Sequence, residues 1–416
     1  MSILFIQICY VAFLYITLNE QNYLPPPFVN DKFDTFMDLF NTLSWGNTNL
    51  MYSIWHSVYP PLNFIFTRLG SIAFSYQSWL PAIVAREFSE NIIFALILYS
   101  VIFPMLVMKF KLWDVASIQD KIIIYFIFIF SPIFIFAVER GNLILILPLI
   151  LAFTLSNHPL SKILGIPLLA NLKLNLALLF IYFLVKKEFK NFFISIFISS
   201  LIFLIAGYLI GDNPFLIIDN YLRFTDEKVI STSNQLYSSI NLSGLYLSLA
   251  DERFRSTIGY FTGDTLLKLG LDFIKLLNFL GIFYVALIII KASKKALSLH
   301  ESPYLIALIL LFTLSIGSFN LLYNLVLLLP IVPVIIKSNS NSIKLLFILL
   351  FVQLDFFSYN FNIPVQQWSY LSHDYVYTYN NPGLGSLLRP IIFFSLTVLF
   401  AYNFTKISID RSLNDK

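Results

Sequence analysis

The chain alternates between long apolar stretches and shorter polar segments along most of its 416 residues. The stretches 122–137 and 304–316 contain no charged residue at all. Apolar runs of roughly 18 residues with few charges are typical of helices that cross a membrane. The pattern therefore predicts an all-α, polytopic integral membrane protein with about ten transmembrane helices. We expect these spans at 2–19, 91–109, 122–138, 142–157, 192–210, 272–291, 303–319, 321–336, 343–357 and 388–405.

One apolar stretch, 163–185, does not fit a single crossing. Lys162 precedes it and a lysine cluster at 186–190 follows it, so both ends carry the basic residues typical of the cytoplasmic side. We therefore predict a membrane hairpin of two short helices over 163–185, with its apex near 172–175. Non-helical backbone at such depth requires protein or a wet cavity around it.

Charge assigns the two sides of the membrane. If the N-terminus is inside, the short segments between spans hold most of the lysines, whereas the acidic residues gather in three long loops at 20–90, 211–271 and 358–387. Because basic residues are retained in the cytoplasm, we expect these loops outside and residues 1–416 as a single transmembrane domain. Acidic residues do not set topology, so either a polar working face or merely solvated loops explain their excess outside.

Composition narrows the class of protein to which the chain can belong. Apolar residues make up 58% of the chain and charged residues only 12%, whereas soluble domains carry about 25% charged residues. The net charge of +4 is small, and the chain has no basic patch interleaved with aromatics. We therefore expect membrane lipids around the protein and no nucleic acid.

Cys9 is the single cysteine, and the four histidines lack ligand spacing, so we expect neither a disulfide nor a metal site. Because 2–18 lacks a basic start and a cleavage site, we expect an uncleaved first span.

The first outer loop contains an acidic, amphipathic segment at 30–41. Four apolar side chains recur there at i, i+3, i+4 and i+7, while Asp31, Asp34 and Asp38 share another face. The pattern predicts an interfacial helix whose apolar side lies in the lipid boundary. Neighbouring carboxylates raise one another's pKa, and a base with a raised pKa accepts protons well at neutral pH. One of these aspartates is therefore a candidate base, with a chemically inert acidic surface helix as the alternative.

An aromatic stretch that includes His56 and Tyr59 follows at 45–61. Aromatic faces stack on sugar rings, but they also populate the belt where a protein meets the membrane interface, and both interpretations fit. A second polar cluster at 231–237 has hydroxyl and amide groups suited to sugars, or forms an ordinary loop.

Two charged positions inside the apolar region need an explanation. Glu139 and Arg140 lie at a tight turn between two spans, where charges are costly unless they are paired or face a polar cavity. A Glu139–Arg140 pair capping the helix ends is one interpretation and a cavity is the other. Lys173 lies at the hairpin apex, where an anion such as phosphate would suit its ammonium, with snorkelling to the outer surface as the alternative.

The order of these segments resembles that of the GT-C glycosyltransferases, nearest to glycosyltransferase family 87, the polyprenyl-phosphate-mannose-dependent α-mannosyltransferases. The resemblance covers residues 1–340. It rests on the acidic segment 36–41, Tyr59-Pro60-Pro61-Leu62, Glu139-Arg140-Gly141-Asn142, Lys173 in the hairpin and Ser233-Asn234-Gln235.

The resemblance implies a GT-C-like helix bundle with interfacial helices in an outer loop, and Asp38 as the catalytic base with Asp34 as second choice. The candidate substrate-binding residues are Arg140, Asn142, Lys173, His56, Tyr59, Asn234 and Gln235. The expected partners are a polyprenyl-phosphate sugar donor and a glycan or glycolipid acceptor. The lipid-linked donor is a substrate, and we expect no cofactor. The site would face outward from the cell membrane, in a bacterial inner membrane.

Two other classes compete with this hypothesis. A transporter or flippase of lipid-linked glycans should show repeated halves with polar residues in several spans, whereas here polar residues gather on one side. A glycan polymerase or ligase should draw on a larger outer loop rich in arginine, and the outer loops here contain few.

Overall fold

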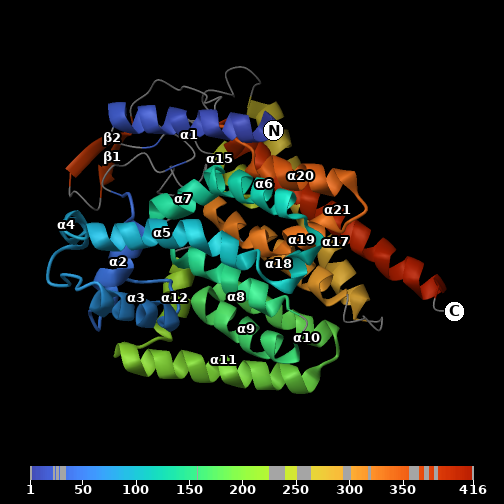
Figure 1. Cartoon of the computed structure of the whole chain (residues 1–416), viewed down its shortest axis with the longest axis horizontal. Coiled ribbons are helices and arrows are strands. Elements are labelled where there is room, and N and C mark those ends of the chain that lie inside the picture. Colours follow the sequence, from blue (N-terminus) through green and yellow to red (C-terminus); the bar gives the residue numbers. More distant parts are fainter. Residues whose placement is uncertain are drawn as a thin grey trace.

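The computed structural model is predominantly helical, with long helices lying side by side (Figure 1). Shorter helices and a two-stranded hairpin gather at one end, on the left of Figure 1, and the chain terminates toward the other end. The described residues are 2–21, 24, 28, 34–156, 158–223, 239–250, 264–293, 301–316, 320–355, 365–369, 374–378 and 383–414.

The elements follow one another along the chain with short connections. The first half contains α1 (Ser2–Gln21), α2 (Met37–Gly46), α3 (Pro61–Ala73), α4 (Ala82–Glu87), α5 (Glu90–Val107), η1 (Lys111–Val115), α6 (Ile118–Ile129), α7 (Pro132–Arg140), η2 (Leu143–Ile146), α8 (Leu147–Thr154), α9 (Pro159–Leu172), η3 (Leu174–Phe180), α10 (Ile181–Val185) and α11 (Phe189–Ile210). The second half contains α12 (Leu216–Arg223), α15 (Leu242–Ala250), α17 (Asp264–Ala292), α18 (Ser302–Ser315), η6 (Leu322–Ile331), α19 (Val332–Ile336), α20 (Asn341–Phe351), the antiparallel strands β1 (Val365–Ser369) and β2 (Asp374–Thr378), and α21 (Leu384–Asn414).

Several of these helices are built to lie in a membrane. Within the described ranges, α5, α11, α17 and α21 are each long and apolar enough to cross one, and α6 with α7 forms a further, bent candidate. The protein is therefore membrane-embedded. Other expected spans coincide with shorter apolar helical segments, among them Ile3–Asn19 within α1, α18 and α20.

The span expected at 122–138 is a bent pair instead of one straight helix. α6 ends at Ile129, and the axes of α6 and α7 differ by 55°. The Ser131 side chain accepts a hydrogen bond from the backbone N–H of Phe134, and Pro132 occupies the first helical position. A serine cap followed by proline starts a new helix, which explains the bend.

The stretch 163–185 folds into two packed helical segments. α9 ends at Leu172, Lys173 has extended backbone (φ −148°, ψ 110°), and η3 begins at Leu174. The side chain of Lys173 therefore projects from a break between two helices.

The acidic segment differs from its prediction in two ways. The helix starts at Met37 instead of near residue 30, because Phe36 has a left-handed backbone (φ 63°) and residues 34–36 form a turn; residues 30–33 lie outside the described part. Its apolar side does not face lipid. Met37, Phe40 and Leu43 are buried in a cluster with residues of the 76–92 region, so the helix packs on protein.

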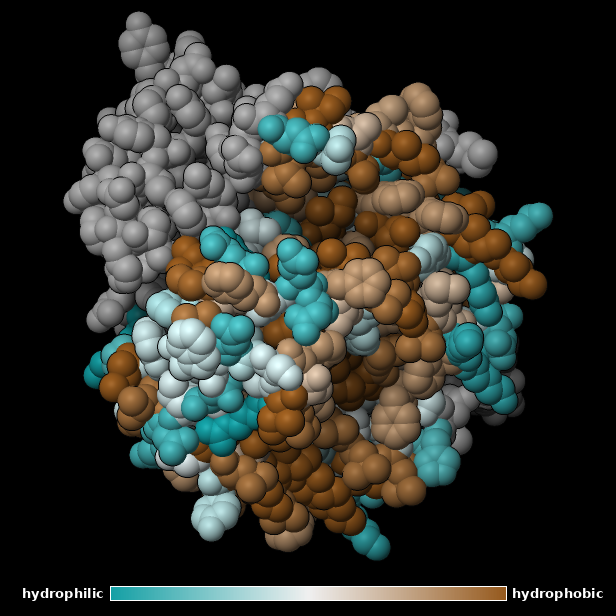
Figure 2. All heavy atoms as spheres, turned by 60° about the vertical axis from the view of Figure 1, so that its left-hand side comes forward, coloured by the Kyte–Doolittle hydropathy of each residue, from teal (hydrophilic) through white to brown (hydrophobic). Residues whose placement is uncertain are grey.

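Burial separates the centre of the molecule from its periphery. α18 is buried along almost its whole length, while α11 and α17 expose many apolar side chains, as expected of helices that face lipid. Figure 2 brings the left-hand end of Figure 1 forward and shows polar side chains gathered beside wide apolar areas. The polar end is where the candidate site lies.

Candidate functional site

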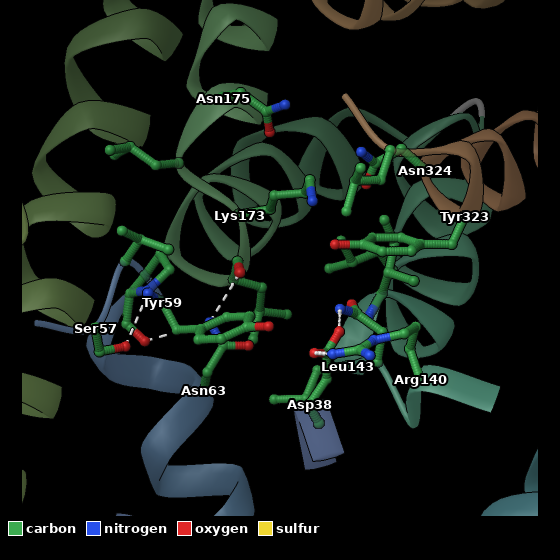
Figure 3. A pocket seen from close by; sticks show the side chains of 18 of the residues that line it. Asp38, Ser57, Tyr59, Asn63, Arg140, Leu143, Lys173, Asn175, Tyr323 and Asn324 are labelled. Carbon is green, nitrogen blue, oxygen red and sulfur yellow. Dashed lines mark hydrogen bonds and ion pairs between the residues drawn. The ribbon is translucent and has the colours of Figure 1, made fainter. Parts of the chain in front are cut away.

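A cavity of about 340 Å³ brings together side chains from segments that lie far apart in the sequence (Figure 3). Its wall combines residues of α2, the segment 55–60, the turn between α7 and η2, the break between α9 and η3, and the start of η6. The charged side chains in this wall are Asp38, Arg140 and Lys173. Asp38 thus shares one cavity with Arg140 and Lys173, which follow it by more than a hundred residues in the sequence.

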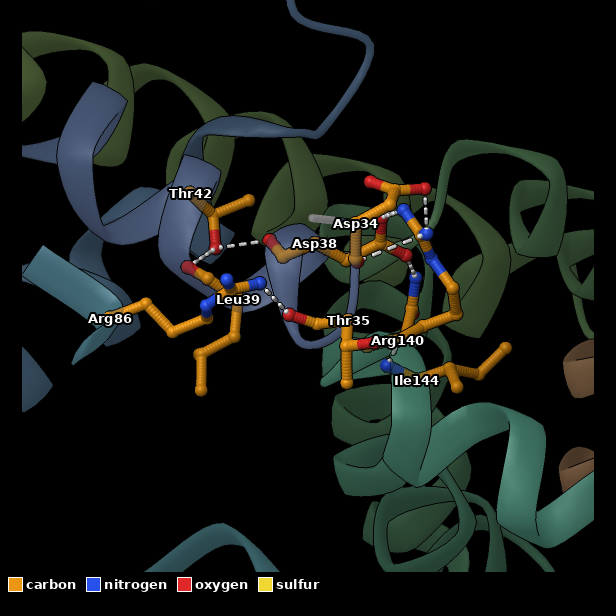
Figure 4. A network of polar contacts seen from close by, with 9 residues as sticks. Asp34, Thr35, Asp38, Leu39, Thr42, Arg86, Arg140 and Ile144 are labelled. Atoms are coloured by element: carbon orange, nitrogen blue, oxygen red, sulfur yellow. Dashed lines mark hydrogen bonds and ion pairs between the residues drawn. The ribbon is translucent and has the colours of Figure 1, made fainter. Parts of the chain in front are cut away.

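Arg140 holds the carboxylates of Asp34 and Asp38 (Figure 4). Its Nη2 donates to Asp38 Oδ1 at 2.5 Å, and its Nη1 forms an ion pair with Asp34. The Nδ2 of Asn142 donates to Asp38 Oδ2 at 2.6 Å. Arg140 therefore pairs with two distant aspartates and not with the adjacent Glu139. The side chains of Arg140, Asp34 and Asp38 are 8%, 17% and 16% exposed, so the network is largely shielded from solvent.

Backbone geometry fixes this network. The backbone N–H of Phe36 donates to the carbonyl oxygen of Glu139 at 2.6 Å, which joins the start of α2 to the end of α7. Gly141 has a left-handed conformation (φ 63°), and a Cβ there would lie 2.9 Å from the Cβ of Leu39. Only glycine combines this backbone with this close approach. The Oδ1 of Asn142 accepts from the backbone N–H of Ile144, which leaves its Nδ2 for Asp38.

Lys173 is a cation without a carboxylate partner among the described residues. Its half-buried side chain points into the cavity, and Nζ lies 5.8 Å from the ring centroid of Tyr323 (Figure 3). Asn175 and Asn324 also line the cavity, and their side-chain oxygens accept no hydrogen bond within the described part of the chain. This side of the cavity thus offers a positive charge to a ligand.

The remaining predicted residues fall into three groups. Tyr59 and His56 line the cavity, the latter from an exposed, left-handed position (φ 49°). Burial, and then the nearby Asp38 carboxylate, raise the pKa of the Tyr59 phenol well above its ordinary value, so it stays protonated and can donate at neutral pH. Asp34 reaches the site through Arg140 without lining the cavity. Asn234 and Gln235 lie outside the described residues.

No protein-family model, curated protein or solved structure matches this chain. The resemblance to GT-C glycosyltransferases therefore stays a prediction that rests on the motifs and on where the fold places them.

Several residues of the cavity wall were not among the individual candidates, although Trp45 lies in the aromatic stretch 45–61 that was considered for sugar binding. Asn41 and Trp45 follow Asp38 at i+3 and i+7 on α2, a spacing that already indicates a shared helix face. Tyr323 and Asn324 belong to a polar turn that is visible in the sequence but has no partner there. Asn63 enters through α3, where its Nδ2 donates to the carbonyl oxygen of Leu172, and no local pattern signals this contact.

Proposed function

We propose that this chain is a multi-pass membrane glycosyltransferase. It moves a hexose, with mannose as first candidate, from a polyprenyl-phosphate sugar to a lipid-linked or envelope glycan. The proposal includes a GT-C-like bundle of about ten transmembrane helices in a bacterial inner membrane, with the site on the outer face. The observation that carries it is one cavity containing a held carboxylate, Asp38, and an ammonium without a carboxylate partner among the described residues, Lys173.

Asp38 is the proposed general base. Each of its oxygens already accepts one hydrogen bond, from Arg140 or Asn142, and a carboxylate oxygen has a second lone pair for an incoming hydroxyl. The acceptor hydroxyl attacks the anomeric carbon and passes its proton to Asp38. The new bond joins the acceptor oxygen to that carbon, the bond from the carbon to the phosphate oxygen breaks, and polyprenyl phosphate leaves with the electron pair. Configuration at the anomeric carbon inverts.

Lys173 is the proposed ligand of the donor phosphate. A phosphate leaving group gains charge as the bond breaks, and a fixed cation stabilises that charge in a site shielded from water. Arg140 is less suited to this role than its charge alone implies, because two aspartates already neutralise it. We therefore assign Arg140 and Asn142 to positioning Asp38.

The test uses the purified chain in proteoliposomes with radiolabelled polyprenyl-phosphate mannose or glucose and extracted envelope glycans. Chromatography of the products distinguishes one added sugar from transfer of a block or from movement of an intact lipid-linked glycan. Asp38→Asn should abolish transfer, and Asp219→Asn, an exposed aspartate on α12, is the matched control. Transport without a new glycosidic bond would contradict the proposal, and near-parent transfer by Asp38→Asn would contradict the role of Asp38.

A further inference from the structure

The cavity face of α2 continues beyond Asp38 in a way that the proposed chemistry does not use. Asp38, Asn41 and Trp45 recur at i, i+3 and i+7, and all three line the cavity. At 1.5 Å per residue, this stripe extends about 10 Å along the helix, away from the Arg140 contact at its start. The cavity wall therefore changes from charged at Asp38 to amide and aromatic at Trp45.

A second tryptophan extends this wall. The rings of Trp45 and Trp55 stack with centroids 6.0 Å apart and planes 18° apart. Trp45 is backed by a buried cluster that includes Tyr52 and Phe64, while Trp55 remains 50% exposed. Trp55 thus presents a supported aromatic surface at the cavity.

The segment that carries Trp55 is held in place by side chains of α12 and of the connection between α11 and α12. The Asp212 carboxylate accepts hydrogen bonds from the backbone N–H groups of Tyr52 at 2.7 Å and Ser53 at 3.3 Å. The Nδ2 of the buried Asn220 donates to the carbonyl oxygens of Tyr52 at 3.0 Å and Ser57 at 3.2 Å. A loop held in this way loses little entropy when a ligand binds.

The side chains around this surface are polar but uncharged. Asn41, His56 and Tyr221 line the same cavity, and the charged groups of its wall are those already assigned to the chemistry. Amide, imidazole and phenol groups both donate and accept hydrogen bonds, as sugar hydroxyls do. A phosphate or a peptide terminus would call for a matching charge, whereas a sugar ring offers an apolar C–H face to an aromatic ring and hydroxyls at its edge.

We infer that Asn41, Trp45 and Trp55 form the acceptor subsite, and that its ligand is a neutral pyranose ring of a glycan. The ring stacks on Trp55, bonds to Asn41 and presents its hydroxyl toward Asp38. The assignment as acceptor rests on the proposed function, whereas the binding of carbohydrate does not.

The experiment measures binding, so that it is independent of transfer. Ligand-observed NMR titrations of the purified chain in nanodiscs use methyl glycosides of mannose, galactose, glucose and N-acetylglucosamine, and their disaccharides. Trp55→Ala should raise the dissociation constant of the best-binding glycoside about tenfold. Trp55→Phe keeps the stacking and should change this constant about twofold at most. Asn41→Ala should raise the same dissociation constant about fivefold. Trp79→Ala removes an exposed tryptophan of the same loop that is outside the cavity wall, and should leave binding unchanged.

Two results would overturn the subsite: no glycoside of the panel binds the parent, or Trp55→Ala binds as the parent does. The first result would assign Trp55 to the interfacial aromatic belt. If glycosides bind through Trp55 but Asp38→Asn still transfers sugar, the carbohydrate subsite stands and the proposed chemistry fails.

Discussion

Two arginines of this molecule, Arg140 and Arg389, form ion pairs with aspartates in very different surroundings. Arg140 with Asp34 and Asp38 lies at the cavity, whereas Arg389 with Asp355 joins the start of α21 to the residues that follow α20. The Arg389 Nη2 and Asp355 Oδ2 atoms are 2.6 Å apart, and their side chains are 1% and 0% exposed. The first network keeps contact with a space that a ligand can enter, and the second is enclosed by protein.

The enclosing residues of the buried pair show what it does. A Cβ at Gly383 or Gly385 would lie 2.4 Å from Asp355 Oδ1, so both glycines leave just enough room for the carboxylate. Such a pair fixes one helix against another and offers nothing to a substrate. The comparison teaches that access to a cavity, and not the presence of an ion pair, distinguishes a candidate catalytic carboxylate from a structural one.

The largest effect on activity is expected for Asp38→Asn. The amide keeps the size of the side chain but accepts no proton, so transfer per folded molecule should fall about 10²–10⁴-fold. Proteoliposome assays normalised to folded protein measure this. A fall of less than tenfold would remove Asp38 from the role of base.

The largest effect on stability is expected for Asp355→Ala. Removing one partner leaves Arg389 buried without its counter-charge, which should lower the free energy of unfolding by about 3–5 kcal/mol. Transfer by the molecules that remain folded should be close to that of the parent. Denaturant unfolding in detergent measures the first quantity and a normalised assay the second.

The double variant Asp355→Leu with Arg389→Met sharpens the contrast. Replacing both members of a buried pair with apolar residues should recover most of the stability. The corresponding double variant at the cavity, Asp38→Leu with Arg140→Met, should stay inactive in transfer. Recovery of activity at the cavity would show that its ion pair is merely structural.

A smaller effect is expected for Lys173→Met, which removes the charge and keeps the length of the side chain. The kcat/KM for the lipid donor should fall about 10–100-fold, because a charge-assisted contact to phosphate is lost. The KM for the glycan acceptor should stay unchanged. Lys268→Met, at an exposed site on α17, is the control, and an equal effect on both substrates would contradict a phosphate role.

The smallest of these effects is expected for Asp34→Asn. Asp34 shares Arg140 but does not line the cavity, so its loss should loosen the arginine and reduce transfer only about two- to tenfold. A loss as large as that of Asp38→Asn would exchange the two roles and make Asp34 the base.

The helices were the most predictable part of the fold. Apolar runs report helices directly, because backbone groups within a membrane must be satisfied by local hydrogen bonds. Local signals also mark the bend of α6 and α7, since Ser131 and Pro132 form a cap that the apolar run conceals. The late start of α2 had no such signal, because the left-handed Phe36 is set by a contact with Glu139 from far along the chain.

Part of the candidate site could be predicted from the sequence, whereas the partners of its charged residues could not. The cost of charge in an apolar region singles out Arg140 and Lys173, wherever their partners lie. That Arg140 pairs with Asp34 and Asp38, and not with Glu139, depends on how two distant segments pack. The Trp45–Trp55 stack likewise depends on the anchoring of its loop by Asp212 and Asn220, which no sequence spacing reveals.

The most direct measurement is photo-crosslinking of the reconstituted chain with a polyprenyl phosphate that carries a photoreactive group beside the phosphate. We predict crosslinked peptides from the cavity wall around Lys173 and Tyr323, and their loss in Lys173→Met but not in Lys268→Met. Crosslinks that lie elsewhere, or that persist in Lys173→Met at the parent level, would contradict the claim that this cavity binds the lipid-linked donor.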